Sequence, residues 1–395
     1  MYYLTSDRLN TKSLETNLLY ILPDSDAGVA SVVRNLLRFH DKSIKTTVVL
    51  LHDELNTTKN RINNLSCDNL VRLEYNSKWS NQAKINKRIK KLISRETIII
   101  SNDGGVELEA LKSIEHPIRV VYVCHGDIQH YYRAIKKHKQ IISYCIAVSQ
   151  VIASKITDIL DDETFKNKIS KIYFPVPQPE TLNRKESNTI RLVFVGSLIK
   201  AKGVLLLPKI VDGLQSLDIN YHLTIIGSGA EENKLKQELG GNRNISFKGR
   251  LPNEEILKIH QDQDVILLPS HNEGLPVVLI EAMKCGVVPL ASNIPSGIPE
   301  IVIDSKTGYK INIGDAERYC KIIHKLYRDH SELNRLSNNC KQFSASNFDP
   351  YNQTRQYEYI YENKADYIEI QPNLWSKVIS YIPFGILYKV KKVLK

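Results

Sequence analysis

The sequence predicts an α/β protein with two Rossmann-like domains whose parallel sheets face a common cleft. Strand-like apolar runs alternate with amphipathic helical stretches in both halves of the chain, and a proline-rich polar stretch lies between the halves. Continuous apolar strands that are each followed by a helix are typical of a parallel sheet covered on both faces. The length of 395 residues is too great for one ordinary core and suits two domains.

The first half contains apolar runs of strand length. They lie at 17–23, 45–51, 96–101, 118–124 and 145–149. Helices are predicted from Val29 to Phe39 and from Gln150 onward. This order of strand, loop and helix predicts the first parallel sheet.

The second half repeats the pattern. Strands are predicted at 190–196, 222–227, 244–249, 264–270, 287–292 and 308–313. The helices between them are predicted at 204–217, 231–239, 254–261 and within 273–286, where Gly286 suits a left-handed cap. Ligands of open α/β sheets bind beyond the carboxyl ends of the strands, so we expect the site in the cleft between the two sheets.

Composition places the domain boundaries. The stretch 175–188 is polar and rich in proline, which is typical of an interdomain linker. We therefore expect an N-terminal domain over 1–178, a linker over 179–189 and a C-terminal domain over 190–347.

Composition and charge also exclude several classes of protein. The six cysteines have no CxxC spacing, so we expect reduced, buried thiols and neither a zinc ribbon nor a redox pair. The first residues lack the basic start and apolar core of a signal peptide, and no apolar run reaches the roughly 18 residues of a membrane span. We expect a cytoplasmic protein. The formal net charge of +11 is compatible with nucleic acid, anionic lipid or anionic small molecules.

The stretch 269–286 is the most informative for chemistry. We expect Glu273 and Gly274 at the start of a helix, with the backbone amides of Gly274, Leu275 and Val277 unpaired. Such amides bind phosphate with help from the helix dipole. Glu281 follows about two turns later, where its carboxylate would accept ribose hydroxyls. The alternative is a merely capped helix with Glu281 in solvent.

Several motifs together resemble one enzyme family. Glu273 and Glu281 stand in PSHNEGLPVVLIEAMKCGVVPLAS, and FVGSLIKAKG, IIGSGAEENKL, FKGRLPNEE and PSGIPEIVIDSKTGYKI lie in order around it. Over roughly 190–315 the chain resembles the family-4 retaining glycosyltransferases of the GT-B fold. The N-terminal half is similar only in short fragments, namely DAG at 26–28, CHG at 124–126 and AVS at 147–149.

This resemblance implies roles for the catalytic residues. Glu273 would contact the hydroxyls of the donor sugar, and His125 would line the cleft near that sugar. Lys202 would neutralise the diphosphate as it leaves, without a metal. The family implies front-face departure and attack, so no protein nucleophile is expected.

The resemblance also implies a set of donor-binding residues. Glu281 would bind the ribose, the backbone near Arg250 and Leu251 would meet the base, and Gly28 would let its loop approach the diphosphate. The full expected set is Gly28, Ser197, Lys202, Arg250, Leu251, Glu273, Gly274, Leu275, Val277 and Glu281.

The chain departs from the family pattern at several positions. Ser197 stands where the family has an arginine, so one of two expected cations is missing; another basic residue substitutes for it or diphosphate binding is weaker. Ala27 replaces the first glycine of the usual Gly-Gly loop. Gly227 and Gly229 form either a ligand-contacting turn or a structural one. Glu300 is expected to be structural.

No metal or cofactor is expected. Asp24 with Asp26, and Asp262 with Asp264, match the Asp-x-Asp pattern of metal-dependent transferases. The second pair directly precedes a predicted strand, and no His/Asp cluster with ligand spacing accompanies either pair.

Basic amphipathic segments indicate an anionic membrane surface as a partner. The stretches 83–95 and 133–139 are rich in Lys and Arg, and the first has apolar residues on one helical face. By resemblance, 348–368 is the helix that crosses back to the first domain, and 369–395 is a basic amphipathic tail. We expect peripheral binding at the inner face of the cytoplasmic membrane. The alternatives are solvated helix faces and a tail packed on the protein body.

The resulting hypothesis is a glycosyltransferase in cell-surface polysaccharide or glycolipid assembly. It would use a nucleoside-diphosphate sugar as co-substrate and a saccharide or lipid-linked acceptor. Alternatives are a sugar-nucleotide epimerase, for which no convincing acid/base pair is found, and a donor-binding but inactive subunit. Nucleic-acid binding is disfavoured because the basic residues lie on amphipathic helices and are not interleaved with aromatic residues.

Overall fold

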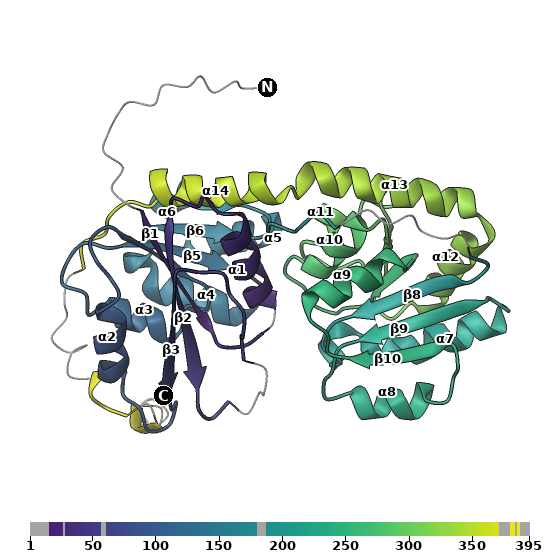
Figure 1. Cartoon of the computed structure of the whole chain (residues 1–395), viewed down its shortest axis with the longest axis horizontal. Helices are drawn as coiled ribbons and strands as arrows, with labels where there is room; N and C mark the ends of the chain where they lie inside the picture. Colours follow the sequence, from purple (N-terminus) through teal and green to yellow (C-terminus); the bar gives the residue numbers. More distant parts are fainter. Residues whose placement is uncertain are drawn as a thin grey trace, which may run out of the picture.

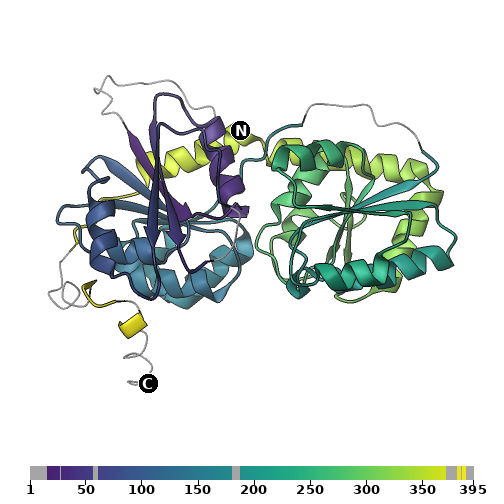
Figure 2. The same cartoon turned by 60° about the horizontal axis from the view of Figure 1, so that its bottom comes forward.

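The computed structural model describes residues 16–26, 28–56, 61–179, 187–370, 380–383 and 385–387. They form two α/β domains side by side, each with a parallel sheet between helices (Figures 1 and 2), which confirms the predicted fold class. Ala27, most of the predicted linker 179–189 and most of the predicted tail 369–395 lie outside the described residues. Within the described ranges, every helix is too short or too polar to cross a bilayer.

The N-terminal sheet has seven parallel strands in the order β3-β2-β1-β4-β5-β6-β7. The strands are β1 (Asn17–Pro23), β2 (Lys45–Asp53), β3 (Asn69–Tyr75), β4 (Thr97–Ser101), β5 (Arg119–Cys124), β6 (Tyr144–Ala147) and β7 (Ile169–Lys171). The helices are α1 (Gly28–Phe39), α2 (Gln82–Lys90), α3 (Val106–Leu111), α4 (Gln129–His138), α5 (Gln150–Leu160) and α6 (Glu163–Lys166). The carboxyl ends of β1, β4 and β5 therefore point the same way, toward the loops that reach the cleft.

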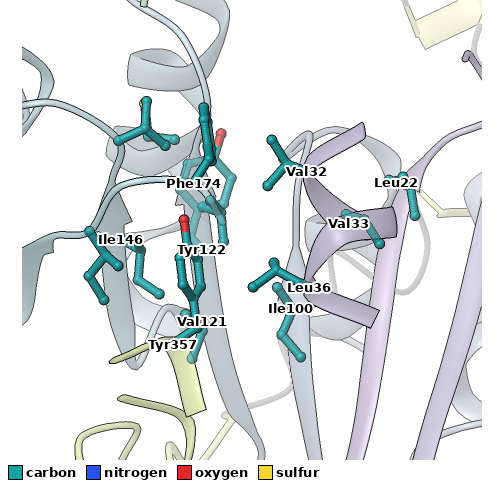
Figure 3. Close-up of a cluster of buried hydrophobic side chains, with 14 of the residues drawn as sticks. Leu22, Val32, Val33, Leu36, Ile100, Val121, Tyr122, Ile146, Phe174 and Tyr357 are labelled. Atoms are coloured by element: carbon teal, nitrogen blue, oxygen red, sulfur yellow. The ribbon is translucent and has the colours of Figure 1, made fainter. Parts of the chain in front are cut away.

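Helix α1 is fixed to this sheet by apolar packing (Figure 3). Val33 and Leu36 of α1 are at most 1% exposed and lie in one cluster with Ile100 of β4 and Val121 of β5. Tyr357 of α14 (Pro350–Asn363) enters the same cluster. Since α1 begins directly after β1, this packing places the start of α1 beside the cleft.

The C-terminal sheet has six parallel strands in the order β10-β9-β8-β11-β12-β13. The strands are β8 (Ile190–Val195), β9 (Tyr221–Ile226), β10 (Ile245–Gly249), β11 (Val265–Leu268), β12 (Val288–Ser292) and β13 (Tyr309–Ile311). The helices include α7 (Leu207–Ser216), α8 (Glu232–Leu239), α9 (Asn253–Gln261), α10 (Val277–Lys284), α11 (Ile298–Ile301) and α12 (Ala316–Arg328). The strand order changes direction at β8, and loops that follow β8, β9 and β11 line the cleft.

Two consecutive helices connect the domains along one edge of the molecule (Figure 1). Helix α13 (His330–Asn347) packs in the C-terminal domain, and α14 continues across to α1. Pro350 lies in the first turn of α14, and the side chain of Asp349 caps it by accepting a hydrogen bond from the Asn352 amide at 2.8 Å. Edge-to-face contact of Tyr361 with Tyr20 secures the helix to the N-terminal domain.

Polar contacts also join the two domains. Glu300 of α11 accepts hydrogen bonds from the Gln150 amide at 2.7 Å and from the Tyr173 hydroxyl at 2.9 Å. The buried Lys284 of α10 donates to the Val176 carbonyl at 2.7 Å, and burial lowers the pKa of Lys284 to about 8. Glu300 is thus a structural carboxylate that connects α11 to the N-terminal domain.

The structure corrects the expected start of the helix that carries Glu281. Helix α10 begins at Val277, so Glu273, Gly274 and Leu275 lie in the loop before it. A residue before proline disfavours the helical conformation, and Pro276 therefore keeps Leu275 out of the helix. The expectation that Glu273 and Glu281 lie two turns apart on one helix is wrong. The edge strand β3 was not predicted, because NLVRLEY mixes charged and apolar residues.

Candidate active site

A cavity of about 670 Å³ lies between the two domains. Its walls include the start of α1, the loop after β5, the loops after β8, β9 and β10, and the segment from 268 to 281. All of the predicted site residues line it, namely Gly28, His125, Ser197, Lys202, Arg250, Leu251, Glu273, Gly274, Leu275, Val277 and Glu281. The fold therefore brings these predicted residues, which are spread from position 28 to position 281, to one cavity. Their individual roles stay predictions.

Glu273 is held in place by two partners before any ligand binds. Its Oε1 accepts a hydrogen bond from the Ser270 hydroxyl at 2.7 Å and forms an ion pair with the Lys202 ammonium at 2.7 Å. The Glu273 side chain is 7% exposed, and that of Lys202 is 29% exposed. An ion pair in such a partly enclosed site is screened less than a surface pair, so the two side chains fix one another at the cavity wall.

The loop that carries Glu273 touches the opposite domain through Gly274. A Cβ atom on Gly274 would lie 2.8 Å from the His125 carbonyl oxygen and 2.9 Å from the Cα atom of Gly126. Gly274 also accepts a hydrogen bond from the amide of Gly297 at 2.6 Å. Only a residue without a side chain permits this approach. Gly274 therefore lets the loop of Glu273 approach the N-terminal domain at the cavity.

Unpaired backbone amides lie at the start of α10. Among the described residues, the amides of Gly274, Leu275, Val277 and Val278 donate no hydrogen bond. The helix dipole adds positive potential at the same place, because α10 begins at Val277. Although Gly274 precedes the helix, the expected unpaired amides are present, and anion binding by them stays a prediction.

Glu281 is buried, so the alternative of a solvated carboxylate is wrong. The side chain lies in the second turn of α10, is 4% exposed, and accepts a hydrogen bond from the Asn253 amide group at 2.6 Å. Burial raises the pKa of Glu281 above its ordinary value, and the bond from Asn253 opposes this rise. A ligand that donates hydroxyl groups to Glu281 would stabilise its ionised form.

His125 presents a hydrogen-bond acceptor and no charge. Asn102 donates from Nδ2 to the carbonyls of Ile21 and Ile100, both at 3.2 Å, so its Oδ1 faces His125 Nε2 at 2.9 Å. This places the proton on Nε2 and leaves Nδ1 as the acceptor. Nδ1 is buried and has no partner within the described chain. Burial lowers the pKa of His125 to about 3, which makes the ring unsuited to general acid/base chemistry near neutral pH.

Three cationic side chains line the cavity. Lys202 pairs with Glu273, Arg34 of α1 pairs with Asp26 at 2.9 Å, and Arg250 donates to the neutral Ser228 hydroxyl at 2.7 Å. The turn of Ser228 is hydrogen-bonded to the loop after β8, because its carbonyl accepts from the Leu198 amide at 2.9 Å. Arg250 therefore reaches the turn adjacent to Ser197.

Gly227 and Gly229 are required by backbone packing. Gly227 has φ of 134°, and a Cβ atom there would lie 1.9 Å from the Gly196 carbonyl oxygen. A Cβ atom on Gly229 would lie 2.4 Å from the Leu198 carbonyl oxygen. These glycines therefore bring the turns after β8 and β9 into contact.

The Asp-x-Asp pairs have structural partners. Asp264 forms an ion pair with Arg191 at 3.1 Å, and buried Asp24 accepts from the Ile62 amide at 2.9 Å. Among the described residues, no group of three or more His, Cys, Asp and Glu side chains is arranged to hold a metal ion.

Sequence reasoning did not identify Asn253, Arg34 and Asn102. Asn253, which donates to Glu281, and Arg34, in the second turn of α1, line the cavity. Asn102 is not part of the lining and contacts the lining residue His125. A usable signal existed for Asn102, since it directly follows the carboxyl end of β4, where ligands of parallel sheets gather.

A cavity between two Rossmann-like domains, with carboxylates, cations and free helix amides on one wall, is suited to a phosphate-bearing ligand. Residues 179–343 match the family model described as Glycosyl transferases group 1. The chain is 30% identical over 169 residues to the amylovoran biosynthesis glycosyltransferase AmsK of Erwinia amylovora, covering 40% of this chain and 41% of AmsK.

Further similarity extends to other relatives and to solved structures. A D-inositol 3-phosphate glycosyltransferase of Corynebacterium jeikeium is 30% identical over 146 residues, covering 34% of this chain and 35% of that protein. The crystal structure of Anabaena Alr3699/HepE in complex with UDP and glucose matches with a TM-score of 0.71 at 16% identity, covering 87% of this chain and 98% of that chain. The chain therefore has the GT-B fold. It spans about half the length of the curated relatives it matches, as the shares of 48% and 58% illustrate.

Proposed function

We propose that this protein is a retaining glycosyltransferase that moves a sugar from a nucleoside-diphosphate sugar to a saccharide or lipid-linked acceptor. The observation that carries the proposal is the arrangement of Glu273, Glu281 and the free amides before α10 around one cavity. The group 1 family match over 179–343 and the relative named for amylovoran biosynthesis support a role in cell-surface polysaccharide or glycolipid assembly.

The C-terminal wall would hold the nucleotide. Glu281 accepts the two ribose hydroxyls, and the backbone near Arg250 and Leu251 meets the base. The amides of Gly274, Leu275 and Val277 donate to the diphosphate, in line with the general use of helix starts as anion sites. Because one similar structure contains UDP and glucose, uridine diphosphate is the first nucleotide to test.

The sugar would lie between the walls, where the reaction takes place. Glu273 accepts from hydroxyls of the sugar, and Nδ1 of His125 accepts from one more. The bond between the anomeric carbon and the diphosphate breaks on the face that the acceptor hydroxyl attacks. Attack on that face retains the configuration without a protein nucleophile, and the departing phosphate takes the acceptor proton.

Two side-chain cations would neutralise the leaving diphosphate. Lys202 contacts the phosphate oxygens from its position beside Glu273, and Arg250 supplies the charge that Ser197 lacks. Arg250 suits this part because its hydrogen-bond partner, Ser228, is neutral and belongs to the turn bonded to the loop of Ser197. With these cations and the helix amides in place, we propose a reaction that requires neither a metal nor an organic cofactor.

The missing charge at Ser197 also favours one competing function. A donor-binding but inactive subunit would bind the nucleotide and transfer nothing. The epimerase alternative is weaker, because a neutral His125 with a pKa of about 3 cannot serve as one member of an acid/base pair near neutral pH.

The experiment combines binding with turnover. Purified protein is heated with UDP-, GDP-, ADP- and CMP-linked sugars, and release of the nucleoside diphosphate is followed with saccharide and lipid-linked acceptors. A ligand at about 100 times its Kd adds roughly 2.7 kcal/mol and raises the midpoint by several degrees. We expect one nucleotide class to stabilise the wild type and not Glu281→Ala. Stabilisation without transfer to any acceptor would favour the inactive subunit, and no stabilisation would refute the proposed donor site.

We further propose that the protein works in the cytoplasm, at the inner face of the membrane. A lipid-linked acceptor would be presented there, and exposed basic helices of the N-terminal domain are suited to anionic lipid headgroups.

A further inference from the structure

The described part of the C-terminal tail returns to the N-terminal domain and docks beside α2. Pro383 forms an antiparallel bridge with Asn81, the residue that caps α2. The amide of Gly385 donates to the Lys78 carbonyl at 3.0 Å. Figure 1 shows this yellow segment close to α2. Residues 380–383 and 385–387 therefore lie against the turn 78–81, although the two segments are about 300 positions apart in the chain.

Large apolar side chains are exposed around this docking point. Trp79 is 69% exposed, Tyr381 is 71% exposed and Ile386 is 51% exposed. Trp79 and Tyr381 come from the two segments that the bridge joins. Their aromatic rings combine an apolar body with a polar edge, which is the composition that gathers at membrane–water interfaces.

Positive charge lies next to these apolar residues. Helix α2 buries Ile85 and Ile89, so the opposite face presents its basic residues to solvent. Within the described chain, Lys84, Lys87 and Lys91 are exposed and form no ion pair. The helix carries no acidic residue, and Lys90 alone pairs with an acid, Glu115, at 3.3 Å.

The second basic segment of the domain differs from α2. In and just after α4, Lys137 pairs with Glu109, and Lys139 pairs with Asp162 at 3.0 Å. Acidic neighbours thus neutralise part of the charge at 133–139, and the stretch at 83–95 retains its positive field. This contrast singles out α2 as the basic surface of the domain.

We propose that the tail–α2 surface, composed of Trp79, Tyr381 and Ile386 with Lys84, Lys87 and Lys91, docks on an anionic lipid bilayer. The aromatic and aliphatic side chains enter the headgroup region, and the lysines contact the anionic headgroups around them. The inference deepens the proposed function. Only the link between the docking surface and a lipid-linked acceptor rests on that function. Binding to the bilayer itself is independent of the donor.

The charge pattern and the apolar residues together favour lipid over nucleic acid. A single-strand platform requires aromatic rings interleaved with basic residues along a groove. Here the aromatic residues lie at one end of α2 and the lysines lie along its exposed face.

Vesicle flotation tests the proposal. The full chain is mixed with vesicles of phosphatidylcholine alone or with added phosphatidylglycerol. We expect binding only to the anionic vesicles and weaker binding as salt rises. Each lysine near an anionic surface contributes about a fivefold gain in partitioning, so Lys84→Gln/Lys87→Gln/Lys91→Gln should lose roughly 100-fold. The matched control Lys209→Gln/Lys258→Gln/Lys321→Gln removes equal charge from the other domain and should change binding less than about threefold.

A tryptophan probe reports the apolar part of the surface. The chain has two tryptophans, so Trp375→Phe leaves Trp79 as the only one. Its emission should shift to shorter wavelength on anionic vesicles, and Tyr381→Ala should weaken the binding. An unchanged thermal midpoint and unchanged stabilisation by UDP in each variant show that the variants are folded and that the donor site is separate.

Three outcomes would overturn the proposal. They are absence of flotation by the wild type, equal loss in the two lysine triples, and binding of an oligonucleotide in place of vesicles with the same sensitivity to the α2 triple. If UDP stabilises neither the wild type nor the variants, but the wild type floats with anionic vesicles and the α2 triple does not, the proposed function fails and the docking surface stands.

Discussion

The two walls of the cavity are built differently. On the C-terminal wall, Glu273 and Glu281 are each held by a described partner, and the loops after β8 and β9 are in backbone contact. On the N-terminal wall, His125 is neutral, and a Cβ atom on Gly28 would meet nothing within 4 Å. The C-terminal wall has two buried carboxylates positioned in advance, and the N-terminal wall leaves open space beside Gly28.

This difference indicates how the cavity divides its work. A charged ligand such as a nucleoside diphosphate gains most from groups that need no rearrangement, because preorganised groups reduce the cost of binding. In the proposed function, the open N-terminal wall has room for the acceptor. The sequence resemblance is also concentrated in the C-terminal half, over roughly 190–315.

The largest expected effect is on the leaving group. We predict that Lys202→Met lowers kcat by about 100- to 1000-fold, as is typical when one group that stabilises developing charge is removed. Lys200→Met is the matched control, since Lys200 is exposed and begins the same short 3-10 turn. Steady-state kinetics of both variants check the prediction, and a similar loss in both would show that the turn matters and the Lys202 charge does not.

A smaller effect is expected for the second cation. Arg250→Met should weaken donor binding by about 10-fold, the value of one charge-assisted hydrogen bond. Ser197→Arg in the same chain should recover most of the loss, because it returns a positive charge to the adjacent turn. Titration with the nucleoside diphosphate measures the affinity of both variants. If Ser197→Arg/Arg250→Met bound the nucleotide as weakly as Arg250→Met alone, the proposal that Arg250 replaces the cation missing at position 197 would be contradicted.

The N-terminal wall should respond less, and through pH. Wild-type His125, with a pKa of about 3, stays neutral at any pH well above that value, so it adds no ionisation to the pH profile between pH 5 and 8. Asn102→Asp places a carboxylate against Nε2, which favours imidazolium and raises the pKa of His125. Because Nδ1 then donates, we expect kcat/KM to fall about 5- to 10-fold at low pH and to recover as pH rises. Asn102→Ala should lower kcat/KM without creating this pH dependence. If kcat/KM were equally independent of pH in Asn102→Asp and Asn102→Ala, the assignment of the His125 proton to Nε2 would be refuted.

The sequence predicts the buried strands and the local motif of the C-terminal wall well, and it predicts the edge strand and one helix start poorly. The strands of both sheets read as apolar runs because they are buried on both faces, as Ile98 to Ile100 illustrate. The charged edge strand β3 has no such signal. Residues of the segment 269–286 are close in sequence, so local motifs identify them. Helix α10 begins later than predicted because Pro276 disfavours the helical conformation of Leu275.

Long-range contacts account for what could not be predicted. Asn253 reaches Glu281 only because α9 packs beside α10, and Asn102 reaches His125 only because β4 and β5 are neighbours. The docking of Pro383 on Asn81 depends on the path of the chain after α14. No local pattern contains these pairs, since tertiary packing alone brings them together.

The most direct test of the account is calorimetric titration of UDP and GDP into the wild type and Glu281→Gln at neutral pH. We predict that at least one nucleotide binds the wild type, and that the variant binds it about 100-fold or more weakly because two hydrogen bonds to a carboxylate are lost. Burial raises the pKa of Glu281, so the unliganded protein loses stability as pH rises from the ordinary carboxyl pKa through the raised one. The unliganded variant should therefore unfold at a higher temperature, and Glu254→Gln, an exposed carboxylate of α9, should change neither quantity. Equal nucleotide affinity in the wild type and Glu281→Gln would contradict a donor site on the C-terminal wall.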